Sequence, residues 1–201
     1  MTSTTDTPRR LQIEEVASEL FRERGYAATS VRDIAQALNL QGGSLYAHMA
    51  SKEDVLWSIV CRAADRFNAE VGPIAADPGS SPADRLRAMI RAHIGVLTSI
   101  QQDAAVFLHE WRFLSAARRA EMSARRDAYE ARFRNVIVQG SETGDFRAVD
   151  ARLTSMAILS ALNGIPTWYS PGGPLTADEV ADQHADLFVH ALETHALETH
   201  E

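Results

Sequence analysis

Apolar residues recur at helical spacing along nearly the whole chain, and this period restricts the fold more than any other feature. Between residues 8 and 24, for example, Ile13, Val16, Ala17 and Leu20 form one stripe at positions i, i+3, i+4 and i+7. No segment has the convincing alternation of a β-strand. The pattern therefore predicts an all-α protein with about nine helices.

Short polar signatures predict where several of these helices begin and end. Ser30 has an acidic partner three residues later, as in a capping box, and "SKED" at 51–54 and "TADE" at 176–179 repeat that spacing. Glycine often ends a helix because it tolerates the left-handed conformation. Gly25 is therefore expected to end the first helix, and Gly140 to end the long helix that precedes it.

The N-terminal quarter of the chain has the organisation of a helix-turn-helix. Three short helices are expected there, with a tight turn between the second, about 30–38, and the third, about 41–49. In such a motif the second helix braces the third, whose N-terminal part enters the major groove of DNA. The sequence predicts a DNA-binding domain at 8–55 and a larger helical domain at 56–201.

The predicted contact helix has no acidic side chain, although the chain has a formal net charge of −7. Gly42 and Gly43 let the backbone approach a ligand closely, and amide groups at a helix start favour phosphate. Neutral donors make many protein–DNA hydrogen bonds, so a low charge does not exclude DNA. Base edges are expected to meet Gln41 and Ser44, and phosphates to meet or lie beside Arg9, Arg10, Thr29, Ser30, Arg32, Tyr46, His48 and Lys52.

The charge of the N-terminal segment limits how strongly one copy can bind DNA. Residues 1–56 contain six basic and eight acidic residues. One copy is therefore expected to show a modest salt dependence, and useful affinity requires a dimer that doubles the contacts. The alternative is that 42–56 is only a turn within a helical core.

The stretch "VASELFRERGYAATSVRDIAQALNLQGGSLYAHMASKEDVL" (16–56) resembles the DNA-binding domain of TetR/AcrR-type transcriptional regulators. The chain departs from that family at Met49 and Ala50, where Phe and Pro are usual, and at Gln41, where a small hydroxyl is usual. The resemblance implies a homodimeric repressor of palindromic double-stranded operator DNA. It also implies a pocket for a small-molecule effector in the larger C-terminal domain.

The C-terminal domain lacks a constellation that predicts catalysis or a cofactor. "HEW" at 109–111 does not have the second histidine of a zinc protease motif, and there is no glycine-rich phosphate loop. Cys61 lies in an apolar helical pattern and is expected to be a buried, inert thiol. The C-terminal histidines are spaced by six, five and five residues, so neighbours do not share a helix face. We expect neither an enzyme nor a metal site.

Aromatic side chains at helical spacing in the C-terminal domain could line an apolar cavity with a few polar groups. The alternative for each of them is an ordinary place in the core. The residues expected at such a ligand site are His93, Leu97, Phe107, Trp111, Tyr129, Phe133, Asn163 and Trp168.

Arginines are concentrated between residues 112 and 134, where seven of them face three acids. The pairs Arg118–Arg119 and Arg125–Arg126 are seven residues apart and so recur on nearly one helix face. Guanidinium groups suit phosphate, which makes these four residues candidates for holding the anionic head of a ligand. The alternative is a solvated helix face.

The loop "GIPTWYSPGGPLTADEV" (164–180) resembles a subgroup of the same family. That subgroup senses acyl-coenzyme A thioesters and controls lipid, steroid or aromatic-acid breakdown. The resemblance implies an acyl-CoA thioester, or another small hydrophobic molecule, as the effector.

The last two long helices are the expected dimer interface, as the resemblance implies. Small residues there allow close helix approach, and apolar residues could complete a four-helix seam. The alternative is that they are buried within one subunit. The interface residues are Ala157, Ala161, Gly164, Val180, Leu187, Phe188 and Ala191.

The sequence contains neither an apolar run of the ~18 residues that a membrane span needs nor an N-terminal secretory stretch. We therefore expect a cytoplasmic protein that binds no membrane. Two hypotheses remain open: a ligand-released dimeric repressor, and a helical acyl-ligand-binding protein without functional DNA binding.

Overall fold

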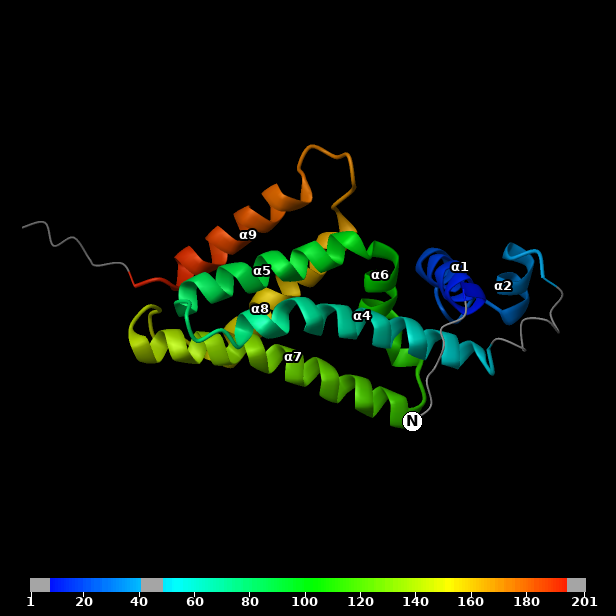
Figure 1. Ribbon diagram of the computed structural model, residues 1–201, viewed down its shortest axis with the longest axis horizontal. Helices are drawn as coiled ribbons and strands as arrows, with labels where there is room; N and C mark the ends of the chain where they lie inside the picture. Colours follow the sequence, from blue (N-terminus) through cyan, green and yellow to red (C-terminus); the bar gives the residue numbers. More distant parts are fainter. Residues whose placement is uncertain (1–7, 41–48, 195–201) are drawn as a thin grey trace, which may run out of the picture. The chain divides into compact units, whose positions relative to one another are not determined.

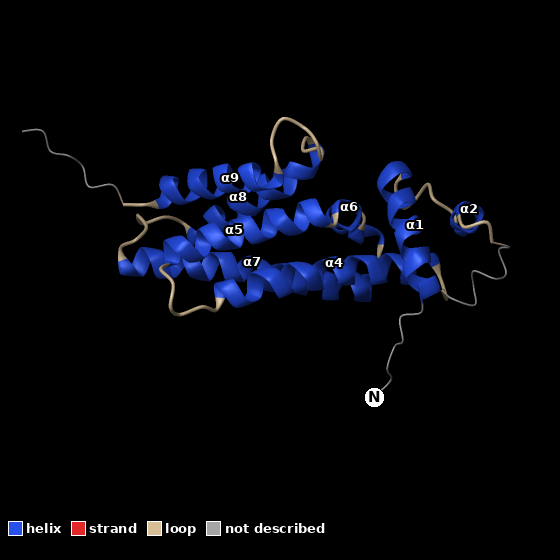
Figure 2. Cartoon of the chain, turned by 45° about the horizontal axis from the view of Figure 1, so that its top comes forward, coloured by secondary structure: helices blue, strands red, loops and turns tan. Residues whose placement is uncertain are grey.

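The chain is all-α, as predicted. The computed structural model describes residues 8–40 and 49–194, and within these ranges it contains eight α-helices, two short 3-10 helices and no strand (Figures 1 and 2). The expected total of about nine helices included one at 41–49, almost all of which lies outside the described residues.

The helices follow one another with short connections. They are α1 (Pro8–Arg24), α2 (Val31–Ala37), α4 (Lys52–Ala75), α5 (Pro82–Ser99), α6 (Gln101–His109), the 3-10 helix η1 (Trp111–Phe113), α7 (Ala116–Thr143), α8 (Ala151–Gly164), the 3-10 helix η2 (Ile165–Thr167) and α9 (Ala177–Leu192).

The predicted helix starts are confirmed where a cap pairs with an acid three residues later. Ser30 and Asp33 form a reciprocal capping box at α2, and Thr176 does the same with its partner at α9. Ser51 accepts the amide of Asp54 at 3.1 Å at the start of α4. These side chains satisfy amides that have no partner inside the helix, which is why so short a signature fixes the start.

The predicted end of α1 is confirmed, whereas the predicted end at Gly140 is wrong. Gly25 has φ +81°, and its amide donates to Phe21 O at 3.0 Å. The helix α7 instead continues through Gly140 to Thr143, before Gly144 at φ +85°. A Cβ at position 140 would overlap the ring of Phe146. Glycine is therefore needed inside α7 for close packing.

Packing divides the chain into two compact units. The first unit comprises the described parts of 1–65 together with 100–124, and the second comprises 66–99 and the described parts of 125–201. The unit boundaries thus fall inside α4 and α7, so both helices contribute to both units. The expected functional division at 55/56 remains a prediction.

Each unit has its own apolar core. In the first unit Ile13, Phe21, Ile34 and Leu56 are at most 1% exposed, and they come from α1, α2 and α4. The core of the second unit gathers buried residues of α4, α5, α7, α8 and α9 around Phe133. The helices α5 and α9 lie side by side (Figure 1). Among the described residues there is no helix with the length and hydropathy that a bilayer crossing requires.

Candidate functional site

The predicted DNA-contacting residues are only partly within the described ranges. Gln41, Gly42, Gly43, Ser44, Tyr46 and His48 lie outside them. The described remainder of the motif consists of α1, the turn to α2, α2 itself and the start of α4.

Lys52 fastens the start of α4 to the turn between α1 and α2. Its ammonium group donates to Tyr26 O at 2.8 Å and to Thr29 O at 2.7 Å. It also lies 4.0 Å from the centroid of the Tyr26 ring. Partial burial lowers the pKa of Lys52. Since an ammonium group has three donors, one proton remains for a phosphate beside these internal bonds.

The hydroxyl of Thr29 has a structural role in place of the expected phosphate contact. The residue is 1% exposed, and its hydroxyl donates to Gly25 O at 2.9 Å. Ser30 is exposed but its hydroxyl is engaged with Asp33 in the capping box. Arg32 is exposed on α2.

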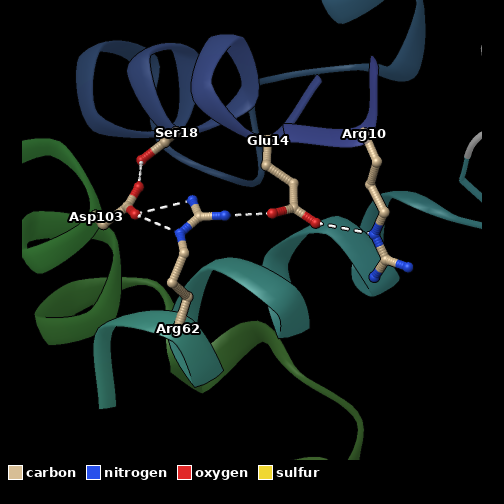
Figure 3. A network of polar contacts seen from close by, with 5 residues as sticks. All are labelled: Arg10, Glu14, Ser18, Arg62 and Asp103. Carbon is tan, nitrogen blue, oxygen red and sulfur yellow. Dashed lines mark hydrogen bonds and ion pairs between the residues drawn. The ribbon is translucent and has the colours of Figure 1, made fainter. Parts of the chain in front are cut away.

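A buried polar network ties α6 to α1 and α4 (Figure 3). The carboxylate of Glu14, 2% exposed, accepts from Arg62 and, at 3.1 Å, from Arg10 Nε. Arg62 also donates from Nε and Nη2 to Asp103 Oδ2 at 3.0 and 2.8 Å. Ser18 completes the network by donating to Asp103 Oδ1 at 2.7 Å. Arg10 is therefore engaged in part with Glu14, whereas Arg9 donates to a neighbouring glutamine side chain on α1.

The connection between α6 and α7 is also fastened within the first unit. Glu110 accepts the backbone amide of Tyr26 at 3.1 Å. Arg118, which was expected to hold a ligand, pairs with Asp54 at 2.5 Å and lies 3.4 Å from Glu53. Segments that precede and follow the predicted contact helix are thus held by residues 110–118.

The second unit contains a buried polar cluster among aromatic rings. His93 of α5 is 3% exposed, its Nδ1 lies 2.8 Å from the Tyr129 hydroxyl, and its Nε2 lies 3.2 Å from Asn163 Oδ1. The ring of Phe67 lies 4.8 Å from His93, and that of Phe133 lies 6.3 Å away. Four of the predicted ligand residues, from α5, α7 and α8, therefore meet here.

Burial determines the protonation of this cluster. It lowers the pKa of His93 to about 4, so the imidazole is neutral at physiological pH. Because Asn163 Oδ1 can only accept, Nε2 carries the proton and Nδ1 accepts from the Tyr129 hydroxyl. Burial also raises the pKa of Tyr129, which remains a neutral donor.

The other predicted ligand residues are distributed over both units. Leu97 is buried in α5, and Trp168, 54% exposed, stacks on His184 of α9. Phe107, Trp111, Arg118 and Arg119 belong to the first unit, and Arg125 and Arg126 to the second.

The predicted dimer residues divide into an exposed and a buried set. Ala157, Ala161, Leu187 and Ala191 are exposed, and Gly164 and Phe188 are half-buried. Val180, at 1% exposure, belongs to the core of the second unit and is not part of an exposed face.

Two exposed residues on α8 were missed by sequence reasoning. Leu153 is 66% exposed and Met156 is 51% exposed. Their spacing from Ala157 and Ala161 is that of one helix face, which was the signal available in the sequence.

No cluster of three or more metal-ligating side chains occurs in the part of the chain that the structure describes. Cys61, expected to be buried, is half-buried on α4.

Two family profiles match the chain. Residues 79–192 match the family described as "Tetracyclin repressor-like, C-terminal domain". Residues 13–59 match the family described as "Bacterial regulatory proteins, tetR family".

Relatives and solved structures resemble the chain over most of its length. The HTH-type transcriptional repressor KstR2 of Mycobacterium tuberculosis is 33% identical over 178 residues, which cover 88% of each chain. The structure of a ketosteroid transcriptional regulator, KstR2 of Mycobacterium tuberculosis, superimposes with a TM-score of 0.88 at 30% identity and covers 94% of this chain and 97% of that one. AibR in complex with isovaleryl coenzyme A and operator DNA has a TM-score of 0.81 at 31% identity, covering 89% and 97% of the two chains.

Proposed function

The chain belongs to the TetR family of transcriptional regulators, and from this premise we propose that it is a dimeric repressor released from operator DNA by an acyl-CoA-like or other small hydrophobic effector. Members of this family bind operator DNA, dimerise and respond to small molecules, and they are not enzymes. A repressor of this kind acts in the cytoplasm. The observation that carries the proposal is the similarity to a KstR2 repressor across 88% of both chains.

The regulated genes are those of steroid, lipid or aromatic-acid breakdown. Support comes from the relatives, one of which is a ketosteroid regulator, while a further similar structure binds isovaleryl coenzyme A. Both are similar to this chain in the effector-binding domain as well as in the DNA-binding domain, because the matched region extends over most of the sequence.

Residues 41–49 would enter the major groove, and each subunit of a dimer would read one half-site, ~34–36 Å from the other. The exposed Arg32 and Ser30 lie on α2, which braces that helix. Arg9 and Lys52 would add phosphate contacts from α1 and α4. Few cations are involved, so each subunit contributes a shallow salt dependence.

The dimer would form through α8 and α9. Support comes from Leu153, Met156 and Leu187, which are large apolar side chains more than half exposed. Burying such side chains against a second copy removes apolar surface from water and leaves the core of each subunit intact.

The effector would bind beside the cluster of His93, Tyr129 and Asn163. Its aromatic neighbours suit an apolar ligand, and the neutral hydrogen-bonding groups suit an oxygen such as a thioester carbonyl. Arg125 and Arg126 on α7 are candidates for the phosphates of a coenzyme A head.

Fluorescence anisotropy with duplex DNA from upstream of the protein's own reading frame, at two salt concentrations, tests the proposal. We expect saturable binding that acyl-CoA thioesters reverse. Binding of acyl-CoA without any DNA binding would favour a helical ligand-binding protein, the alternative that the acidic N-terminal segment supports. Release by an uncharged hydrophobe and not by acyl-CoA would exclude the coenzyme A head from recognition.

A further inference from the structure

Arg118 at the start of α7 holds the first turns of α4 from one side. Its Nη2 donates to Asp54 Oδ1 at 2.5 Å, and its Nη1 lies 3.4 Å from Glu53 Oε1. The guanidinium carbon lies 5.6 Å from the centroid of the Trp57 ring. One side chain therefore contacts three residues on a single face of α4, and all of them belong to the first unit.

The two carboxylates are also held by other groups. Asp54 Oδ2 accepts from the Ser51 hydroxyl at 2.6 Å, and that hydroxyl accepts the Asp54 amide at 3.1 Å. Glu53 Oε1 accepts the amide of Ser115 at 3.0 Å. Arg118 thus binds the residue that caps α4, and the backbone just before α7 binds its neighbour.

These bonds keep the carboxylates charged. The Ser51 hydroxyl and then Arg118 lower the pKa of Asp54, and the Ser115 amide is the main cause of a lowered pKa at Glu53. Both acids are therefore ionised wherever the protein is near neutral pH, and their attraction to Arg118 persists there.

The held turn is the base of the predicted contact helix. That helix is expected to end at Met49, whose side chain is 6% exposed, and α4 begins at Lys52. With so short a connection, any loosening of the first turn of α4 is passed to the contact helix. A capped turn opens less often than an uncapped one.

A single exposed ion pair would be too weak to matter, and the three side chains here are each about one-third exposed. The arrangement differs from such a pair because one guanidinium meets two carboxylates and an aromatic face. Contacts that converge on one rigid group lose less side-chain entropy for each contact formed.

We propose that Arg118 is a positioning residue for DNA binding, which fixes the start of α4 and through it the predicted contact helix. It would touch neither DNA nor effector. The role rests on the proposed function, because it concerns how the regulator presents its contact helix.

The test compares Arg118→Gln with Arg66→Gln, which removes the same charge and an exposed ion pair from α4 itself, to Glu70. Hydrogen exchange followed by mass spectrometry reports the opening of residues 51–58. Fluorescence anisotropy with the upstream duplex reports affinity, and thermal melting reports global stability.

We expect Arg118→Gln to speed exchange in 51–58 and to weaken DNA binding about fivefold. The slope of log Kd against log salt should stay that of the wild type, because no phosphate contact is lost. Arg118→Lys should restore part of the affinity, and Arg66→Gln should change neither exchange in 51–58 nor affinity. Melting temperatures of the two Gln variants should agree, since a purely structural role would lower that of Arg118→Gln.

A double-mutant cycle adds an independent check. Glu53→Gln keeps an oxygen for the Ser115 amide but loses the charge facing Arg118. The two substitutions together should cost less affinity than the sum of their separate effects. Additive losses, a shallower salt slope, or unchanged affinity in Arg118→Gln would overturn the positioning role. A wild-type protein that binds no duplex would instead overturn the proposed function, and the DNA-positioning role with it.

Discussion

Arg62 is the main counter-charge of Glu14, a carboxylate that is 2% exposed inside the first unit (Figure 3). The pair joins α4 to α1, and the bonds from Arg62 to Asp103 extend the connection to α6. A buried carboxylate that loses its partner retains the cost of desolvation without the attraction that offsets it. The pair is thus a point at which a change in α6 reaches the DNA-binding helices.

Replacing Arg62 with Met should therefore destabilise the protein by about 2 kcal/mol. The expected loss is below that of a fully buried pair, because Arg62 is 35% exposed and Arg10 still contacts Glu14. Urea unfolding measures the difference. Arg66→Met, which removes an exposed pair on the same helix, should cost less than about 0.5 kcal/mol. Adding Glu14→Gln to Arg62→Met should recover part of the loss, and no recovery would contradict the pairing.

His93 should make the stability of the protein depend on pH. Its pKa is about 4 in the folded protein, compared with 6.5 as the ordinary value, because the ring is buried. The unfolded chain then binds more protons between these values, so stability is complete above about pH 6.5 and is lost as pH falls toward 4. The lost contribution is up to about 3 kcal/mol.

The contribution of His93 is isolated by comparing the wild type with His93→Gln, which does not titrate. Unfolding free energies at several pH values between 4 and 7 should fall more steeply for the wild type. Carboxylates contribute equally to both proteins and cancel in the difference. Parallel curves would mean that His93 is not buried as a neutral group.

Gly140 should resist substitution although it lies inside a helix. A Cβ there would overlap the Phe146 ring, so Gly140→Ala should destabilise by about 1–3 kcal/mol. Gly95, within α5, has no atom within 4 Å of a built Cβ, so Gly95→Ala should stabilise by about 0.5–1 kcal/mol. Thermal melting of both variants should give shifts of opposite sign, and a stabilising Gly140→Ala would contradict the packing of Phe146.

The contrast between these glycines marks what the sequence can predict. Helix period and capping pairs depend on residues within four positions of one another, so the all-α class and the starts at Ser30 and Thr176 were predictable. Gly140 was taken for a helix end because its need for space comes from tertiary packing. A local rule does not contain that information.

The candidate site shows the same limit. Thr29 was expected at a phosphate, yet its hydroxyl faces the backbone of Gly25. Arg118 was expected at a ligand, yet its partner Asp54 lies 64 residues away in the chain. A sequence shows that a cation is present, but only the packing of helices shows which acid it meets. The grouping of His93, Tyr129 and Asn163 was partly foreseeable, because each was already a candidate on its own helix.

The exposed apolar side chains of α8 and α9 should hold two subunits together. Leu187→Arg, at a residue that is 63% exposed, places a charge in the proposed seam, where it would be buried without a partner. We expect size-exclusion chromatography with light scattering to show a monomer, and affinity for a palindromic duplex to fall at least about tenfold, since one copy reaches only one half-site. Val138→Arg, at an α7 residue 38% exposed, should leave the dimer intact. If Leu187→Arg remains dimeric, the seam lies elsewhere on the subunit.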